Sequence, residues 1–155
     1  MTLRLARTED AAAIAVVHRQ AMRISLPFLP ELHTPQQDLA FVQDRLSATN
    51  TIWVAELDGK VAGYIAFHDG WIDHLFVDPE HQGAGLGSAL LNKALAEGAE
   101  RKLWTFQKNS RARTFYEARG FVAEMFTDGE ANEEKEPDVL YRRPAVDTAE
   151  ASARD

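Results

Sequence analysis

The sequence contains no cysteine, and this absence limits the chemistry that the protein can perform. Disulfide bonds and thiolate zinc sites are excluded, and so is any mechanism that passes an acyl group through an enzyme thiol. For acyl transfer, direct attack by a substrate is the simpler route that remains. The five histidines show neither H-E-x-x-H nor H-x-H spacing, so we expect no bound metal.

Long apolar runs and an excess of basic residues are also missing. No stretch of about 18 apolar residues could cross a membrane, and the first residues do not resemble a secretion signal, so we expect a cytoplasmic protein. Lys and Arg number 17 against 24 Asp and Glu, which gives a net charge of −7. An acidic chain without a basic stripe argues against nucleic acid or an anionic membrane surface as a partner.

The net negative charge of the chain comes from two short segments. Residues 128–138 carry a sum of −5 and residues 144–155 a sum of −2, so the rest of the chain is neutral. With 155 residues, of which 45% are hydrophobic, the chain can form one domain with a real core. We expect this domain over residues 1–143 and a flexible tail over 144–155, where hydrophobic periodicity is absent.

The first half of the chain predicts two helices followed by three strands. One helix should begin at Thr8 and end near Ser25, and another should cover residues 36–46. Asp58-Gly59 and Asp69-Gly70 favour tight hairpins, so the strand-like runs between and beside them should form an antiparallel meander. The expected strands are 51–57, 60–67 and 71–77, and the expected buried helix positions are Ile14, Val17, Ala21, Ile24, Leu39, Val42 and Leu46.

The strand over 71–77 leads into a glycine-rich turn. Asp78-Pro79 ends the strand, and Gly83, Gly85 and Gly87 precede a leucine-rich helical repeat. Glycine lacks Cβ and permits positive φ, so successive N–H groups of this turn can converge on an anion. The first amides of a helix have no partner within the helix, and the helix dipole adds positive potential, so phosphate is the natural ligand.

Glycine content alone does not identify the phosphate ligand. A dinucleotide-binding turn has G-x-G-x-x-G directly after a strand, whereas here Ser88 stands at the sixth position and three residues separate the bend from the first glycine. A P-loop requires Gly-Lys-Ser/Thr, which is absent. A nucleotide-binding module stays as one alternative function.

The segment Gln82-Gly83-Ala84-Gly85-Leu86-Gly87 resembles the pyrophosphate-binding signature Gln/Arg-x-x-Gly-x-Gly/Ala of the GNAT superfamily of N-acetyltransferases. A second motif of that family follows over residues 109–121, and the resemblance covers roughly residues 3–143. It implies a mixed α/β (α+β) fold with a mostly antiparallel sheet of about six or seven strands and helices on both faces. It also implies splayed central strands, which would form a slot for the pantetheine arm.

The resemblance implies acetyl-CoA as the cosubstrate. The amides of the glycine turn would hold the pyrophosphate, Ser88 would add a hydroxyl donor, and Gln82 would brace the turn or contact phosphate. The strand before the turn would pair its backbone with the pantetheine, and one of its N–H groups would stabilise the developing oxyanion. The expected cofactor-binding residues are Leu75, Phe76, Val77, Gln82, Gly83, Ala84, Gly85, Leu86, Gly87, Ser88, Asn109, Ala112, Phe115 and Tyr116.

Two residues are expected to carry the chemistry. By resemblance, Tyr116 is the general acid that protonates the departing CoA thiolate, and a buried core tyrosine is the structural alternative. Phe115 and Tyr116 are adjacent and cannot share a helix face, so one can pack inward while the other faces the slot. The base that takes the amine proton would be Asp73, or water in its place. His74 should point to the face opposite Asp73 and be structural.

The acceptor is expected to be a primary amine of a small molecule or of a peptide. His33, Trp71, Glu133 and Glu134 are candidate lining residues, since the acidic loop could attract a cationic amine, although such a loop is ordinarily a solvated turn. Other functions left open are a non-catalytic acyl-CoA sensor and a protein N-terminal or lysine acetyltransferase. The sequence also leaves open a monomer or a homodimer and the use of longer acyl-CoAs.

Overall fold

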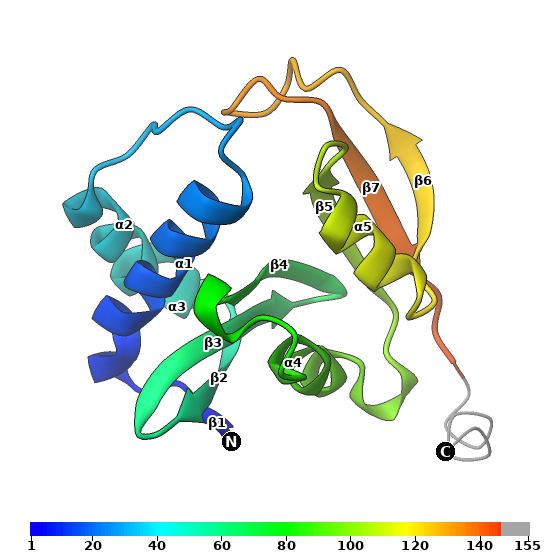
Figure 1. Cartoon of the computed structure of the whole chain (residues 1–155). Coiled ribbons are helices and arrows are strands. Elements are labelled where there is room, and N and C mark those ends of the chain that lie inside the picture. Colours follow the sequence, from blue (N-terminus) through cyan, green and yellow to red (C-terminus); the bar gives the residue numbers. More distant parts are fainter. Residues whose placement is uncertain (147–155) are drawn as a thin grey trace. The chain divides into compact units, whose positions relative to one another are not determined.

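The computed structural model describes residues 1–146 and shows two compact units, with the boundary after Ala94 (Figure 1). Each unit has its own strands and helices. The expected single domain over 1–143 stays a prediction, and most of the expected tail, residues 147–155, lies outside the described part of the chain.

The first unit contains the antiparallel meander that the sequence predicts. Its four strands lie in chain order, and each neighbouring pair is antiparallel. Both residues of Asp58-Gly59 and of Asp69-Gly70 have positive φ, as a tight type I′ hairpin requires. The strands are β1 (Thr2–Leu5), β2 (Thr51–Leu57), β3 (Lys60–His68) and β4 (Trp71–Val77).

Two helical segments connect β1 to β2. After the short 3-10 turn η1 (Thr8–Asp10), helix α1 (Ala11–Ser25) ends next to Pro27, as expected. Helix α2 (Pro35–Phe41) continues through a π-helical turn, η2 (Val42–Leu46), into α3 (Ser47–Thr49), so it is longer than the predicted range. The Thr34 hydroxyl caps α2 by accepting from the Gln37 N–H at 3.1 Å.

The predicted buried helix positions are confirmed except for one. Ile14, Val17 and Ala21 are buried, whereas Ile24 is 61% exposed. At 100° per residue, Ile24 lies about 80° around the helix from Ile14, at the edge of the stripe and in the last turn. The prediction for Ile24 is therefore wrong. In the second segment Val42 and Leu46 are buried, and Leu39 packs against the same core.

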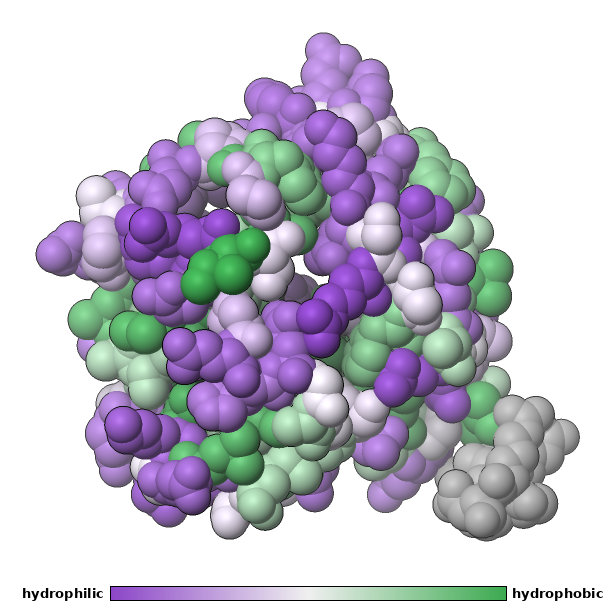
Figure 2. Space-filling model, viewed as in Figure 1, coloured by the Kyte–Doolittle hydropathy of each residue, from purple (hydrophilic) through white to green (hydrophobic). Residues whose placement is uncertain are grey.

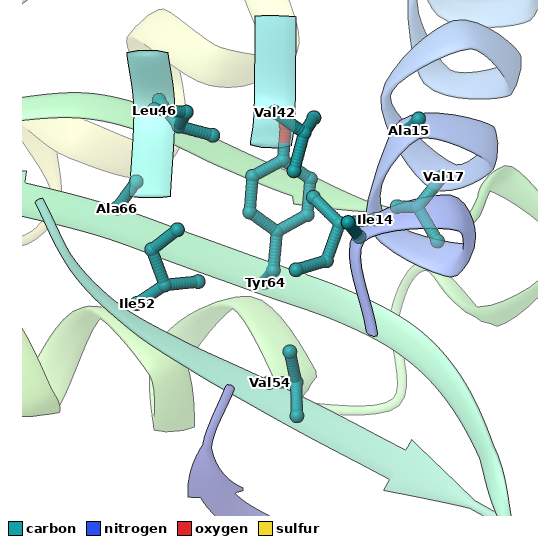
Figure 3. Close-up of a cluster of buried hydrophobic side chains, with 10 residues drawn as sticks. Ile14, Ala15, Val17, Val42, Leu46, Ile52, Val54, Tyr64 and Ala66 are labelled. Atoms are coloured by element: carbon teal, nitrogen blue, oxygen red, sulfur yellow. The ribbon is translucent and has the colours of Figure 1, made fainter. Parts of the chain in front are cut away.

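Helices cover both faces of the strands in the first unit. The side chain of Tyr64 on β3 packs in a core with residues of α1 and η2, where Val42 and Ile14 lie beside its ring (Figure 3). A Cβ on the preceding residue, Gly63, would lie 3.3 Å from Leu90 of helix α4 (Leu86–Ala94). Because successive strand residues point to opposite faces, α1 and α4 lie on opposite faces.

Residues 95–146, the described part of the second unit, contain three strands and one α-helix. The strands lie in the order β5-β7-β6, and both pairs are antiparallel. Gly120, with φ of 90°, lies between the helix and the next strand. The elements are η4 (Ala96–Gly98), β5 (Arg101–Phe106), α5 (Ser110–Glu117), β6 (Val122–Phe126) and β7 (Asp138–Arg143).

The mixed α/β fold class and the mostly antiparallel strands are confirmed, with seven strands among residues 1–146. The expected splaying of the central strands stays a prediction, because β4 and β5 belong to different units. Hydrophilic residues cover most of the face shown in Figure 2, and hydrophobic residues form small separate groups there.

Candidate active site

The glycine turn, residues 78–88, connects β4 to α4. Asp78 caps the 3-10 turn η3 (Pro79–His81) by accepting from the Glu80 N–H at 3.0 Å. Gly83 and Gly85 have φ of +87° and +85°, and a Cβ built at either residue would meet no atom within 4 Å. The backbone of this turn is therefore open to a ligand at the two positions where glycine is needed.

Helix α4 begins directly after the second of these glycines. The Gly85 carbonyl accepts from the Ala89 N–H at 3.1 Å, so Gly85 lies at the N-terminus of the helix. Gly83, Ala84 and Gly85 are exposed. The amides of a first helical turn point away from the helix, where the dipole adds positive potential. This geometry suits a phosphate or pyrophosphate group.

Gln82 holds the turn against the rest of the first unit. Its Nε2 atom lies 3.5 Å from the Val77 carbonyl oxygen and 3.3 Å from the Ser25 hydroxyl oxygen. The first contact ties the turn to the end of β4, and the second ties it to the end of α1. The structure therefore shows the bracing role, while contact between Gln82 and phosphate stays a prediction.

The three residues expected to pair with pantetheine form the last part of β4. Leu75, Phe76 and Val77 lie opposite Ile65, Tyr64 and Gly63 of β3, and their side chains are partly buried. A Cβ on Gly63 would lie 3.1 Å from the Phe76 carbonyl oxygen, so a larger residue there would require the two strands to move apart by a few tenths of an ångström. Packing thus fixes the position of this strand end.

Asp73 lies at an irregularity of β4. Ala66 pairs with His74 and Phe67 with Ile72, so Asp73 is the extra residue of a β-bulge. In a regular strand, the side chain of Asp73 would face the same side as those of Leu75 and Val77. The bulge interrupts this alternation at Asp73. The Asp73 Oδ2 atom is 3.2 Å from His68 Nδ1, and 37% of the Asp73 side chain is exposed. Asp73 is thus accessible and paired with a histidine that the sequence analysis did not single out.

His74 is enclosed by aromatic rings from three elements. It stacks on His18 of α1 with ring centroids 5.1 Å apart and on Phe41 of α2 at 5.8 Å. Its Nδ1 atom is 2.8 Å from the Tyr64 hydroxyl oxygen. Loss of solvation, with a smaller effect of His18, lowers the pKa of His74 to about 3. These are the surroundings of the structural residue that we expected.

The two other expected acceptor-side residues of this unit lie in different places. Trp71 is partly buried and pairs with His68 across the β3–β4 hairpin, so it belongs to the neighbourhood of Asp73. His33 is exposed in the loop before α2, and its carbonyl oxygen accepts from Arg19 Nη1 at 3.1 Å. Trp71 is therefore next to the His68–Asp73 contact of β3 and β4, whereas His33 lies on the loop before α2.

The second family motif forms helix α5 and its start. Asn109 caps the helix, because its Oδ1 accepts from the Ala112 N–H at 3.2 Å. This leaves the amide nitrogen of Asn109 as the atom that could donate to a ligand. Phe115 lies one turn further on, and the Arg119 guanidinium lies 3.8 Å above the centre of its ring.

Tyr116 is the buried residue of α5. It is 8% exposed and packs edge-on against Phe115 and Phe121, with ring centroids 5.2 and 5.3 Å away. Burial raises the pKa of Tyr116 above its ordinary value, so the phenol keeps its proton at neutral pH. The Tyr116 hydroxyl is not among the buried side-chain atoms of residues 1–146 that lack a hydrogen-bond partner. The inward position of Tyr116 agrees with the core alternative, and its hydroxyl keeps a proton that it could donate to a ligand.

A second tyrosine of this unit was missed by sequence reasoning. The Tyr141 hydroxyl on β7 accepts from Arg113 Nε at 2.9 Å and donates to Glu117 Oε2, and both partners lie on α5. Burial, followed by the hydrogen bond to Glu117, raises the pKa of Tyr141. A single tyrosine in a strand carries no sequence signal for such a network. The network holds the helix that carries Tyr116 against β7.

The acidic loop is an ordered turn. Asn132 donates to the Glu136 carbonyl at 2.7 Å, and the Glu136 N–H donates back to Asn132 Oδ1 at 3.2 Å. A Cβ on Gly129 would lie 2.2 Å from the backbone of Glu136, so only glycine fits. Glu133 is exposed and Glu134 partly exposed. Their carboxylates can therefore attract a cation, although the loop needs no ligand for its order.

Residues 1–146 were also compared with the requirements of a metal site and of a membrane-spanning helix. Within residues 1–146, no group of three or more His, Asp and Glu residues is arranged to hold a metal ion. No helix in the same range combines the length and apolar character needed to span a membrane.

Comparison with known proteins agrees with this geometry. A family model of the acetyltransferase (GNAT) domain matches residues 48–123, which include the glycine turn and α5. The chain is 31% identical over 111 residues to the L-amino acid N-acyltransferase MnaT of Escherichia coli, and the matched region covers 64% of this chain and 64% of MnaT. It is 33% identical over 84 residues to the peptidyl-lysine N-acetyltransferase YiaC of the same bacterium, over 54% of this chain and 58% of that one.

A solved structure extends the likeness to the whole fold. YncA of Salmonella typhimurium, determined with its cofactor acetyl-CoA, matches with a TM-score of 0.71 at 22% identity, over 95% of this chain and 94% of that chain. The chain spans only 41% to 64% of the lengths of the first curated relatives that it matches. The family model over residues 48–123 and the relatives named as N-acetyltransferases support membership of the GNAT superfamily of acyltransferases, and YncA shares the fold.

Proposed function

We propose that the protein is an acetyl-CoA-dependent N-acetyltransferase in which a primary amine attacks the thioester directly in a ternary complex. The observation that carries this proposal is the glycine turn. Two exposed glycines with positive φ stand at the N-terminus of α4, directly after β4, and leave the backbone open to a pyrophosphate. The acetyl-CoA held by YncA, which shares the fold, supports the choice of ligand.

Tyr116 is the proposed general acid. Its phenol is buried and has a raised pKa, so a protonated hydroxyl would be available to the CoA thiolate as the C–S bond breaks. Asn109 would donate its free amide nitrogen to the pantetheine, and Ala112 and Phe115 would pack beside it. Asp73 would take part in removing a proton from the amine.

The proposed acceptor is a primary amine of a small molecule or a peptide. MnaT is named for L-amino acids and YiaC for peptidyl-lysine, and both kinds of acceptor present such an amine. Exposed carboxylates at Glu133 and Glu134 support a cationic acceptor, because opposite charge raises the local concentration of a substrate. His33 and Trp71 are further candidates for acceptor contact.

The test is release of free CoA thiol from acetyl-CoA with a panel of L-amino acids, polyamines and lysine peptides. For Tyr116→Phe, we expect kcat to fall by about 100-fold or more while acetyl-CoA still binds, because only the proton donor is lost. Tyr64→Phe removes another buried tyrosine hydroxyl outside the proposed machinery and should keep kcat.

The alternatives give different results in the same assay. A sensor domain would bind acetyl-CoA and release no thiol with any amine. Equal kcat values for wild type and Tyr116→Phe would remove Tyr116 from the mechanism.

A further inference from the structure

A second cluster of chemically active side chains lies at the end of the β3–β4 hairpin. His68 Nδ1 is hydrogen-bonded to Asn50 Oδ1 at 3.0 Å and lies 3.2 Å from Asp73 Oδ2. The side chains of His68 and Asp73 are 31% and 37% exposed. The cluster lies within the first unit, and a substrate can reach it from solvent.

The hydrogen bonds around Asn50 fix the orientation of its amide. Asn50 Nδ2 donates to the Leu46 carbonyl at 3.2 Å and to the Thr49 hydroxyl oxygen at 3.1 Å. The Thr49 hydroxyl donates its own proton to the Arg45 carbonyl at 3.1 Å, so it accepts from Asn50. A carbonyl can only accept, and therefore the oxygen of the Asn50 amide must be the atom that faces His68.

This orientation determines the tautomer of His68. Its Nδ1 atom faces two oxygens that accept hydrogen bonds, the amide oxygen of Asn50 and a carboxylate oxygen of Asp73. An unprotonated Nδ1 would direct its lone pair at both oxygens, so the proton resides on Nδ1. In the neutral imidazole, Nε2 then carries a free lone pair, which is the atom that a general base uses.

The bulge in β4 places this pair near the segment proposed to hold the thioester. Asp73 precedes Leu75 by two residues on the same strand, a separation of about 7 Å along an extended chain. β-bulges re-aim side chains and are frequent beside active sites. The role proposed for the pair therefore requires an acceptor whose amine lies between His68 and Leu75.

We propose that His68 is the general base for the acceptor amine and that Asp73 and Asn50 are positioning residues that fix its tautomer. This inference rests on the proposed acetyltransferase function. The ammonium group gives one proton to His68 Nε2, and the resulting amine attacks the thioester carbon. The N–C bond forms, the C–S bond breaks, and the sulfur takes a proton from Tyr116. A second proton leaves the amine nitrogen and restores the phenol.

The sharpest variant is His68→Asn. The asparagine amide nitrogen can take the place of Nδ1 toward Asn50 and Asp73, while the basic Nε2 is lost. We expect a fall in kcat of about 100-fold or more, no change in acetyl-CoA affinity, and loss of the acidic limb of the pH profile of kcat/KM. Among the described residues, Asp73 is the titratable group in contact with His68. Asp73→Asn should therefore change the pH at which kcat/KM falls on the acidic side of the profile.

A matched control is Asp69→Asn. It removes one carboxylate from the same hairpin, and asparagine tolerates the positive φ of that position. Its kcat and pH profile should equal those of the wild type. Long-range ¹H–¹⁵N NMR of wild type at neutral pH should show the His68 proton on Nδ1, and Asp73→Asn should increase the population of the other tautomer.

The outcomes separate the two proposals. A wild type that releases no thiol with any amine overturns the proposed function and this inference with it. An active wild type whose His68→Asn variant keeps kcat and its acidic limb overturns only the role of His68. A His68 proton found on Nε2 overturns the tautomer argument even if the variant loses activity.

Discussion

Arg4 and Asp10 form an ion pair of low exposure at the start of the first helix. Two nitrogen atoms of the guanidinium contact the two carboxylate oxygens at 2.7 and 2.9 Å, and the Arg7 N–H donates to the same carboxylate at 2.6 Å. Asp10 is 7% exposed. The hydrogen bonds from Arg4 are the main reason that the pKa of Asp10 is lowered to about 2.

We predict that Asp10→Asn lowers the free energy of unfolding by about 2 kcal/mol at neutral pH. The carboxylate has a lower pKa when folded than when unfolded, so its contribution is present above pH ~4 and is lost as the pH falls toward ~2. Urea denaturation at pH 7 and pH 3 measures the difference, which should be smaller at pH 3. Glu9→Gln, an exposed neighbour, should change little. Equal losses at both pH values would contradict the ionic origin.

Single residues differ in how far the sequence predicts them. The glycines at 83 and 85 were predictable, because positive φ restricts the residue type. The contact of His68 with Asp73 was not, because it depends on a bulge that interrupts the alternation of β4. Asn109 was predicted as a ligand contact, and its capping bond shows that one side chain can serve the helix and still offer a donor.

At the scale of elements, the packing of α1 and α2 on β4 depends on a neutral histidine. His74 lies between the rings of His18 and Phe41, where a charged imidazolium would be poorly solvated. Its folded pKa of about 3 lies below the ordinary value of 6.5. Below pH ~6.5 the unfolded chain therefore binds a proton that the folded chain does not bind.

We predict that the free energy of unfolding falls with decreasing pH below pH ~6, with His74 contributing about 1.4 kcal/mol per pH unit. His74→Phe keeps the stacked ring and removes the titration, so the slope between pH 6.5 and 5 should become shallower. Chemical denaturation across this pH range is the measurement, and an unaltered slope in His74→Phe would show that His74 is solvated.

Most elements were predictable from local signals. Hairpin turns, prolines and glycines fixed the ends of β2, β4 and α1, because these residues restrict backbone conformation. The π-helical turn of η2 and the bulges of β3 and β4 were not predicted, since they result from packing between elements. The exposure of Ile24 has the same origin, because the width of a buried helix face depends on what covers it.

At the scale of the whole molecule, the account depends on the ligand of the glycine turn. The fold class followed from two motifs and the order of the elements, whereas the acceptor did not, because the loops that would contact it have no fixed sequence pattern. Gly59 offers a matched control for the turn. It has φ of +76° and no atom within 4 Å of a Cβ, so it resembles Gly85 in backbone strain and open space.

The measurement that tests the central claim most directly is calorimetric titration with acetyl-CoA, beside NAD and ATP. We predict that wild type and Gly59→Glu bind acetyl-CoA but neither NAD nor ATP. Gly85→Glu should not bind acetyl-CoA, because its carboxylate repels the pyrophosphate at the start of α4. Wild type that binds NAD or ATP in preference to acetyl-CoA, or that binds none of them, would contradict the account.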